Sequence, residues 1–446
     1  MLPKRYAVQL ATASNVTKLI DNEIAKISKK FSSSLSTQEA YLRSIGLPRE
    51  EIKPLLFRQQ RAYENRVSLL KTNSCTAVQA ALANTDSCPI SVQLLDADLH
   101  GSKLPIRLTF DDRSLVLKYG DLNCYKLVEE LVREGFDLNM KVASLTRDET
   151  EFGWFSRTWI REGDRGDPKR QAYGLGFLAA IVFYFNIFDI DYENYIMTPA
   201  GSIPIDLECF LYPLDNRAFS FSADFVAISN SVIGVDASNG RSIFSEYSDL
   251  HLSQNGFEIV RDVPRTEHPI RDEQGNIARV ADYIREFSDG YNDTIRALIR
   301  NNERNAAILE SLKLRSRKLF RPTSFYKLLV EEMSAYGVGL MREVFRGRIK
   351  IAGTPPTFPT IPITDWEFAQ LSAGNIPIFH VDIHNCQIYS NYRPTRHAWF
   401  KSPFSQWREK ILMLNEPRIS TTLRMMVNRL VSADDGGHSR RAIPSV

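Results

Sequence analysis

The apolar stretch at residues 175–188 constrains the fold of this chain more than any other segment. It is interrupted by Asn186, charged residues follow it, and it is shorter than the roughly 20 residues that a membrane span needs. Apolar side chains lie on most faces of the helix that the pattern predicts over residues 169–185, which is typical of a buried helix. We therefore expect this helix to lie at the centre of a globular domain, with the residues after it held close to the core.

The segment that follows this helix, residues 189–208, reads DIDYENYIMTPAGSIPIDLE. It places Asp189, Asn194 and Asp206 around a short apolar hairpin. One carboxylate can orient an attacking hydroxyl, while an amide oxygen and a second carboxylate can hold magnesium on a triphosphate. The order D-x-x-x-x-N, turn, strand, Asp follows the layout of a protein-kinase catalytic loop and its metal-binding aspartate. The segment predicts an enzyme that uses ATP and magnesium, without naming the reaction.

Composition excludes several other classes of protein. The net charge of +3 is too small to indicate binding to nucleic acid or to an acidic membrane surface. The five cysteines form no CxxC pair and no zinc-like spacing. An odd, unpatterned number of cysteines favours the reducing cytoplasm, and the N-terminal residues lack the apolar core of a secretory signal. We expect a cytoplasmic protein with an ordinary globular core and no membrane span.

The pattern along the chain predicts an α+β fold with four regions. Residues 1–89 form a helical N-terminal segment, and residues 90–165 form a β-rich lobe. Residues 166–432 form a helical lobe, and residues 433–446 form a disordered tail. The strands are expected at residues 90–95, 106–110, 114–119, 141–146 and 155–160, and the region from 210 to about 276 is expected to be irregular. The later helices are expected at residues 280–298, 305–314, 324–345 and 405–430.

Lys118 lies at the end of the strand predicted at residues 114–119. A lysine on a β-rich lobe, followed by the Asp, Asn and Asp set on a helical lobe, is the order found in kinases. The lysine neutralises phosphate charge in such enzymes. The glycine-rich loop G-x-G-x-x-G is missing, since residues 98–102 offer only DLHGS. Phosphate binding must therefore differ from that of an ordinary protein kinase.

Several segments in order carry a specific resemblance. They are DADLHG, LVLKYGDL, FGWFSRTWI, DIDYENYIMTPAGSIPIDLE, RSRKLFRPTSFY and AGNIPIF. They resemble the D-x-H, V-x-K-P-R-S-L, Y-G-W-x-E-F, D-x-H-Y-E-N with IDLE, R-x-x-x-R-P-T-x-x-Y and GDIPYF motifs of one family. That family is the dehydratase domain of the class II lanthionine synthetases, the LanM type. The resemblance extends from about residue 90 to about residue 430.

The resemblance implies a lipid-kinase-like, two-lobed fold and a two-step reaction. Such enzymes use ATP and Mg²⁺ to phosphorylate Ser and Thr of a ribosomal precursor peptide with a leader. They then eliminate the phosphate, which leaves dehydroalanine or dehydrobutyrine. The partners implied are the precursor peptide and either a separate cyclase or other enzymes that mature such ribosomal peptides, because nothing in this sequence resembles the zinc-binding cyclase domain of the family. A stand-alone dehydratase is therefore expected.

The phosphorylation residues implied by the match are Asp189, Asn194, Asp206 and Lys118. Asp189 is expected to act as the base or orienter of the substrate hydroxyl. Asn194 and Asp206 carry the oxygen donors that suit magnesium. Lys118 is a point charge for phosphate, and it can also stabilise the enolate charge that builds up during elimination.

The elimination residues implied by the match are Asp98, His100, Arg317 and Thr323. A guanidinium can hold the leaving phosphate through two parallel hydrogen bonds, and a hydroxyl can donate to it. These four residues favour the full two-step reaction over simple phosphorylation.

Each of these residues also has a structural interpretation. Asp189 and Asp206 could be turn or helix-cap carboxylates, Lys118 a solvated strand-end lysine and His100 a turn histidine. Arg317 could belong to a solvated basic helix face, and Thr323 could be a helix N-cap. The pair Asp382 and His384 resembles two metal ligands, but no third ligand is in view, so we interpret it as structural.

Two departures from the family pattern affect the interpretation. This chain has Asp191 where the family has histidine, and FGWFSRTWI lacks the family glutamate. Clustered carboxylates raise one another's pKa or recruit a cation, so Asp191 is expected to face the phosphate site through magnesium or to mark altered phosphorylation. Two alternatives to a dehydratase remain open: a kinase-like phosphotransferase without elimination, and an inactive homologue that binds a peptide.

Overall fold

The computed structural model describes most of the chain in segments. These segments are residues 15–29, 48–83, 87–95, 103–127, 142–146, 152–159, 166–190, 194–214, 248–261, 270–318 and 361–435, together with a few isolated positions. Short gaps within them lie at residues 125, 200, 254–255, 277, 279 and 373–374. Helices and strands both contribute to the fold, which confirms the α+β class.

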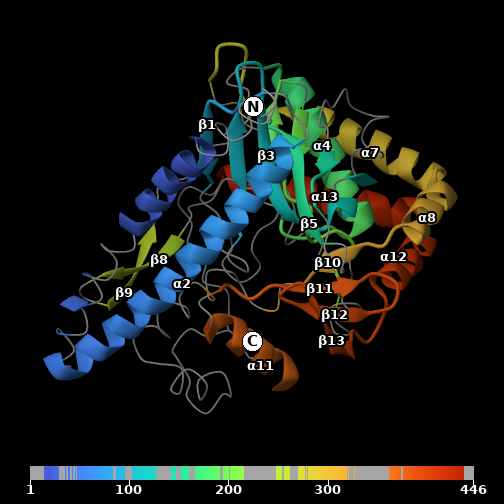
Figure 1. Cartoon of the computed structure of the whole chain (residues 1–446). Helices are drawn as coiled ribbons and strands as arrows, with labels where there is room; N and C mark the ends of the chain where they lie inside the picture. The colour runs from blue at the N-terminus through green and yellow to red at the C-terminus, as the bar shows by residue number, and fades with distance from the viewer. Residues whose placement is uncertain are drawn as a thin grey trace, which may run out of the picture.

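The N-terminal half contains a five-stranded antiparallel sheet in the order β1-β2-β3-β5-β4 (Figure 1). Its strands are β1 (Ser91–Leu94), β2 (Ile106–Thr109), β3 (Ser114–Gly120), β4 (Val142–Ser144) and β5 (Gly153–Thr158). The β2–β3 hairpin is the one that the sequence predicted, with Thr109 paired to Ser114 and the backbone N–H of Phe110 donating to Arg113 O at 2.7 Å. All five expected strands of this region are present, and the one expected at residues 155–160 begins and ends two residues earlier, at 153–158.

Helical residues before the sheet pack on it. Val16 and Ile20, from the helical residues 15–29, share a hydrophobic cluster with the C-terminal half of the helix α2 (Arg49–Leu82) and with inward-facing sheet residues such as Ile106. In Figure 1, α2 is the long blue helix whose later turns approach β3. Burial of this apolar face holds α2 against the sheet.

The central helix of the fold is α4 (Pro168–Phe185), as the apolar pattern predicted. Asp167 caps its first turn by accepting a hydrogen bond from the backbone N–H of Lys169, Pro168 occupies the first helical position, and Asn186 ends it in a left-handed conformation with φ 50°. Every residue from Gly174 to Phe185 is buried. The helix lies side by side with α7 (Ile284–Arg300) (Figure 1).

The remaining elements include a second sheet, a short hairpin and several helices. A four-stranded sheet has the order β10-β11-β12-β13, with β10 (Arg315–Arg317), β11 (Phe379–Asp382), β12 (Gln387–Ser390) and β13 (Arg393–Ala398). The other elements are the hairpin β6 (Tyr195–Thr198) and β7 (Gly201–Pro204), the 3-10 helix η1 (Val280–Tyr283), and the helices α8 (Asn302–Ser311), α11 (Ile361–Ser372), α12 (Pro403–Leu412) and α13 (Glu416–Asp435). Figure 1 places the second sheet below α4, next to α11.

The structure corrects two expectations. The region expected to be irregular, from 210 to 276, contains a hairpin of β8 (Ser248–Ser253) and β9 (Gly256–Arg261). The single helix expected at 405–430 is two helices, because Asn415 begins a new helix by accepting a hydrogen bond from the backbone N–H of Arg418. The helix expected at 324–345 lies outside the described residues.

No helix in the described part of the chain combines the length and apolarity that a membrane crossing requires.

Candidate functional site

Lys118 is presented by the middle strand of the five-stranded sheet. It lies on β3, opposite Phe155 on β5. Leu117, its neighbour, is fully buried in the sheet core, and adjacent residues on a strand point to opposite faces. Lys118 therefore points away from that core, and its side chain is only 13% exposed. The structure does not support a solvated strand-end lysine.

The loop after α4 brings Asp189, Asn194 and Asp206 together. Asp189 has a left-handed backbone with φ 60°, and the Asn194 side-chain amide donates to its carbonyl oxygen. The carbonyl oxygen of Asn194 in turn accepts the backbone N–H of Ile205 at 2.8 Å and that of Asp206 at 3.3 Å. The side-chain amide and the backbone carbonyl of Asn194, at the base of the β6–β7 hairpin, thus hold all three predicted residues in one loop cluster.

A chain of ion pairs joins this loop to β3 and to β10. Lys118 Nζ lies 2.7 Å from Asp206 Oδ2 and 3.1 Å from Glu208 Oε1. The other oxygen of that second carboxylate, Glu208 Oε2, lies 3.2 Å from Arg317 Nη1. Two cations and two carboxylates from three separate segments therefore meet at one place.

Arg317 enters this network from a buried strand. Its backbone N–H donates to Glu208 O at 2.7 Å, and its side chain is 8% exposed. Burial is the largest single influence and would lower the pKa of the guanidinium, but the Glu208 carboxylate and the other nearby negative charges together raise that pKa above its ordinary value. Asp189 and Asp206 act in the same direction. The structural interpretation of Arg317 as part of a solvated helix face is wrong.

Glu208 is the member of the network that sequence reasoning did not select. It is the last residue of the IDLE segment, two positions after Asp206. Residues two apart in an extended segment point to the same side, so this spacing was the available signal. The backbone N–H of Glu208 also donates to Asp206 Oδ1 at 3.3 Å, which keeps the two carboxylates in a fixed relation.

An aromatic cluster closes one side of the network. The rings of Tyr119 and Tyr392 meet edge to face at 4.9 Å, and Phe152 lies 5.1 Å from Tyr392 and 4.8 Å from His380. Burial raises the pKa of the Tyr392 hydroxyl above its ordinary value, and the nearby Glu208 carboxylate adds to that effect. Lys103 Nζ lies over the rings of Tyr119 and Tyr392 at 4.2 and 4.9 Å. The two sheets therefore meet at this cluster.

Several predicted residues are not placed by the structure. Asp98, His100, Thr323 and the variant position Asp191 lie outside the described residues. Their assigned roles stay predictions. Of the eight predicted site residues, the structure describes Lys118, Asp189, Asn194, Asp206 and Arg317, which lie around one loop cluster and its ion pairs.

The donor set fits a hard cation such as magnesium. The Asn194 amide oxygen and the Asp206 carboxylate belong to residues whose backbones are hydrogen-bonded to each other. Oxygen donors of this kind are those that Mg²⁺ takes in phosphoryl-transfer sites. Among the residues that the structure describes, no group of three His, Cys, Asp or Glu side chains could hold a metal ion by itself. A cation held by these donors would need further ligands from outside this set, such as water.

Asp382 and His384 have a structural role, as the sequence predicted. Asp382 Oδ1 accepts the backbone N–H groups of His384 and Asn385, both at 3.0 Å. His384 Nε2 lies 3.1 Å from Leu309 O and 3.2 Å from Leu312 O. The pair therefore fixes a turn and holds it against the end of α8.

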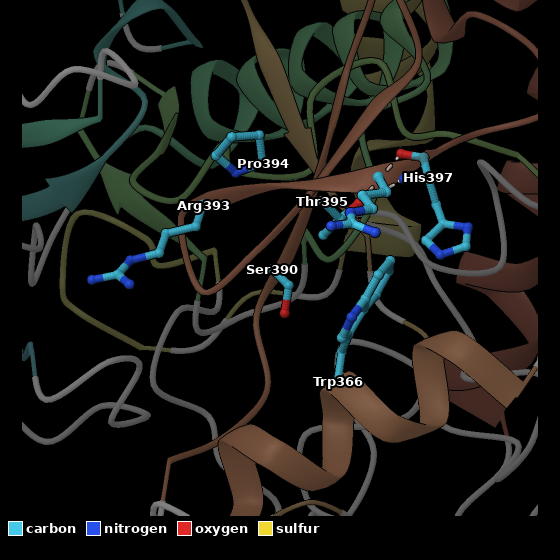
Figure 2. A pocket seen from close by; sticks show the side chains of 7 residues that line it. Trp366, Ser390, Arg393, Pro394, Thr395 and His397 are labelled. Atoms are coloured by element: carbon cyan, nitrogen blue, oxygen red, sulfur yellow. Dashed lines mark hydrogen bonds between the residues drawn. The ribbon is translucent and has the colours of Figure 1, made fainter.

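A separate hollow of about 480 Å³ lies between α11 and the β12–β13 hairpin. Figure 2 shows Trp366 of α11 directed toward His397 of β13, with Ser390 on the adjacent strand. The Trp366 and His397 rings are 5.0 Å apart. None of the predicted site residues lines this hollow, so we do not assign phosphoryl transfer to it.

Comparison with known proteins gives two matches. Residues 249–382 match a family described as "Domain of unknown function (DUF4135)", and this match includes Arg317. The chain is also similar to the "Lacticin 481/lactococcin biosynthesis protein LcnDR2" of Lactococcus lactis subsp. lactis, with 22% identity over 361 residues. That alignment covers 68% of this chain and 36% of the relative, so the chain spans about a third of the relative's length. Both matches confirm the resemblance to the LanM type of lantibiotic synthetase.

Proposed function

We propose that this relative of the LanM-type lantibiotic synthetases is a peptide dehydratase of lanthipeptide maturation. It would phosphorylate Ser and Thr of a ribosomal precursor peptide with ATP and Mg²⁺ on a kinase-like, two-lobed fold, and then eliminate the phosphate. The observation that carries the proposal is the shared Glu208 carboxylate. It ties Lys118, which belongs to the phosphorylation set, to Arg317, which belongs to the elimination set.

In the first step, Asp189 accepts the proton of the substrate hydroxyl while the hydroxyl oxygen bonds to the terminal phosphorus of ATP and ADP departs. Lys118 offsets the negative charge on the phosphates. Asn194 and Asp206 would hold magnesium, which neutralises charge on the triphosphate. Burial of the surrounding carboxylates and cations strengthens these electrostatic effects, because the local dielectric is low.

In the second step, a base removes the proton from Cα of the phosphorylated residue. The Cβ–O bond breaks, the Cα–Cβ double bond forms and phosphate leaves. Lys118 can stabilise the enolate charge that develops on the carbonyl oxygen. Arg317 can hold the leaving phosphate. Asp98, His100 and Thr323 are proposed to complete this step.

The test is mass spectrometry of a candidate precursor peptide after incubation with the full chain, ATP and magnesium. Loss of one water per modified Ser or Thr supports the proposal. Arg317→Ala should accumulate phosphorylated peptide, since its expected role is confined to the leaving group. Asp206→Ala should lower the rates at which the phosphorylated and the dehydrated peptide form, by on the order of 10² to 10³-fold. Arg408→Ala, which removes an exposed arginine, is the matched control.

Arg317→Ala also removes the buried ion pair with Glu208, so a second variant is needed to separate the role in elimination from a loss of folding. Arg317→Lys keeps the positive charge but loses the two-donor fork. Phosphopeptide that accumulates with this folded variant supports the elimination role. Normal dehydration by both variants contradicts it.

The second candidate function is phosphorylation without elimination. One observation favours it: Arg317 is already engaged by Glu208, which is the partner expected of a structural arginine. A peptide that gains phosphate with the wild-type chain and never loses water supports this candidate. A precursor that binds but is not changed supports an inactive homologue that presents the peptide. Asp191→His, compared with the wild type for ATP turnover, tests whether this position faces the phosphate site.

A further inference from the structure

Two buried lysines show how this fold accommodates a cation among aromatic rings. Lys318 Nζ lies 4.2 Å from the ring centre of Tyr212 and donates a hydrogen bond to Pro213 O at 2.8 Å. Lys410 Nζ lies 4.0 Å from the ring centre of Phe183 and donates to Asn186 Oδ1 at 2.7 Å. Each lysine thus has both a ring and an acceptor within the fold, which is what a structural buried cation requires.

Arg315 has the rings but not the acceptors. It is 7% exposed, and its Cζ lies 5.0 Å from the ring centre of Phe152 and 4.8 Å from that of Tyr389. Its Nε and Nη1 are fully enclosed, and none of the described residues accepts a hydrogen bond from either atom. An enclosed, charged donor without an acceptor is unfavourable, because its hydration has been lost without replacement.

Backbone N–H groups donate to both oxygens of one nearby carboxylate and to one oxygen of another. Asp121 Oδ2 accepts the backbone N–H of Arg315 at 2.8 Å, and Asp121 Oδ1 accepts that of Asn123 at 2.9 Å. Asp382, the cross-strand partner of Arg315, uses Oδ1 for the turn of residues 384–385. These bonds fix the backbone around Arg315 and leave its side-chain donors for another acceptor.

The position of Arg315 relates it to the candidate site. Arg315 and Arg317 are two residues apart on β10, so they lie on the same face of that strand. His380, the cross-strand partner of Arg317, packs on the same Phe152 ring that contacts Arg315. Aromatic rings contact a guanidinium without accepting its in-plane hydrogen bonds, so the enclosed Nε and Nη1 of Arg315 still need an acceptor, and a group with two oxygens matches their geometry.

We propose that Arg315 is a phosphate-binding residue, a second guanidinium on the same strand face as Arg317, whose in-plane N–H groups donate hydrogen bonds to oxygens of a phosphate group during the reaction. This deepens the proposed function and rests on it for the identity of the phosphate. Phe152 directly precedes β5 of one sheet, and Tyr389 lies on β12 of the other. Separation of the two sheets would open the edge of the guanidinium to the ligand.

The experiment measures binding of inorganic phosphate to the full chain by isothermal titration calorimetry. We expect Arg315→Met, which keeps an apolar side chain between the two rings, to weaken phosphate binding at least tenfold. Arg315→Lys keeps the charge without the fork and should give an intermediate loss. Arg408→Met is the matched control, since it removes an exposed arginine paired with Glu310, and should leave phosphate binding unchanged.

Thermal unfolding without phosphate separates this role from a structural one. A structural arginine would make Arg315→Met less stable than the wild type. The proposal expects an equal or higher Tm for Arg315→Met, because the enclosed donors without acceptors are gone, and expects loss of the Tm increase that phosphate causes. Phosphate that binds folded Arg315→Lys and the wild type equally overturns the proposal. The proposal is also overturned if Arg315→Met has a lower Tm than the wild type while Arg315→Lys binds phosphate as the wild type does.

Two further arms identify the source of the phosphate. Weaker binding of Mg–ATP to Arg315→Met assigns the contact to the nucleotide. Accumulation of phosphorylated precursor peptide, with unchanged ATP binding, assigns it to the leaving phosphate. Phosphate binding needs no precursor peptide. If the protein binds phosphate through Arg315 but never modifies a peptide, the proposed function is wrong and this inference still stands. If the protein dehydrates the peptide but its phosphate binding does not change when Arg315 is replaced, this inference is wrong and the proposed function still stands.

Discussion

At the scale of single residues, Glu208 is the carboxylate that links the two cations of the described site. It accepts from Lys118 and Arg317 at once, and its side chain is 14% exposed. Removing one partner of a buried ion pair leaves the other charge without compensation, which commonly costs about 3–5 kcal/mol. Glu208 is therefore expected to matter for stability as well as for the arrangement of the site.

We predict that Glu208→Gln lowers the free energy of unfolding by about 2–4 kcal/mol in urea titrations, because two cations lose one carboxylate. Glu409→Gln is the matched control. Glu409 pairs with Lys401 at 2.5 Å, but its side chain is 46% exposed, so the loss there should stay below about 1 kcal/mol. Equal losses of unfolding free energy in the two variants would contradict the interpretation that the ion pairs of Glu208 are buried and stabilising.

The cysteines give a second prediction at this scale, on pH dependence. Burial raises the pKa of the Cys124 and Cys209 thiols well above the ordinary value, so the reactive thiolate is scarce until the pH is high. Cys88 is exposed. At about pH 8, near the ordinary thiol pKa, a disulfide reagent should modify Cys88 first and spare the two buried thiols.

The cysteine prediction is checked by stopped-flow absorbance and mass spectrometry of the labelled chain. Cys88→Ser should remove the fast phase of labelling that we assign to the exposed Cys88 thiol. Labelling of Cys124 and Cys209 should rise with pH, because a raised pKa moves thiolate formation to higher pH. Rapid labelling of either buried thiol at about pH 8 in the folded protein would show that the site opens readily.

At the scale of elements, α4 and α7 pack with almost no space between their backbones. A Cβ added at Gly176 would lie 1.9 Å from Phe287 O, and one added at Gly290 would lie 2.1 Å from Tyr173 O. A backbone carbonyl cannot move away as a flexible side chain can. The two glycines therefore determine how closely the helices approach, and α4 carries the loop of Asp189.

We predict that Gly176→Ala destabilises the protein by about 1–3 kcal/mol, the usual range for an overpacked core. Helix propensity alone gives the opposite sign, because alanine favours a helix over glycine by about 1 kcal/mol. The sign of the change in the free energy of unfolding, measured by urea titration, therefore shows whether close packing or helix propensity dominates at this position. Gly120→Ala is the control, since its Cβ would meet Phe155 at an ordinary 3.8 Å.

At the scale of the whole molecule, the aromatic cluster joins the two sheets. Tyr392, between β12 and β13, contacts Tyr119 on β3 and Phe152 before β5. The same interface carries the ion pairs from Lys118 to Glu208 and from Glu208 to Arg317. Residues far apart in the sequence thus depend on each other for burial, and we expect the sheets to unfold together.

We predict that Tyr392→Ala lowers the free energy of unfolding by about 3 kcal/mol, the lower end of the range for loss of a buried aromatic side chain. It should also reduce the denaturant slope, because the two sheets would no longer unfold as one unit. Phe400→Ala is the control. Its side chain is 48% exposed, so the loss should stay within about 0.5 kcal/mol. A sharp single transition with unchanged slope in Tyr392→Ala would contradict the coupling of the sheets.

The sequence by itself determined the local parts of this protein. The buried helix α4, the β2–β3 hairpin and the cluster of Asp189, Asn194 and Asp206 follow from periodicity, turn residues and short spacings. Each depends on contacts within about 20 residues, where helical and strand periods dictate which side chains share a face. The relation to the LanM type also came from ordered motifs, and the two matches bear it out.

Only the tertiary structure decided which distant residues share a site. Lys118, Glu208 and Arg317 come from three segments, and Arg317 lies on a buried strand where its basic neighbours suggested a solvated helix. The β8–β9 hairpin and the break before α13 were also missed. Ion pairs, and acceptors for an enclosed cation such as Arg315, depend on how sheets and helices stack. No local pattern of residue types encodes that stacking, because burial is a property of the whole packed chain.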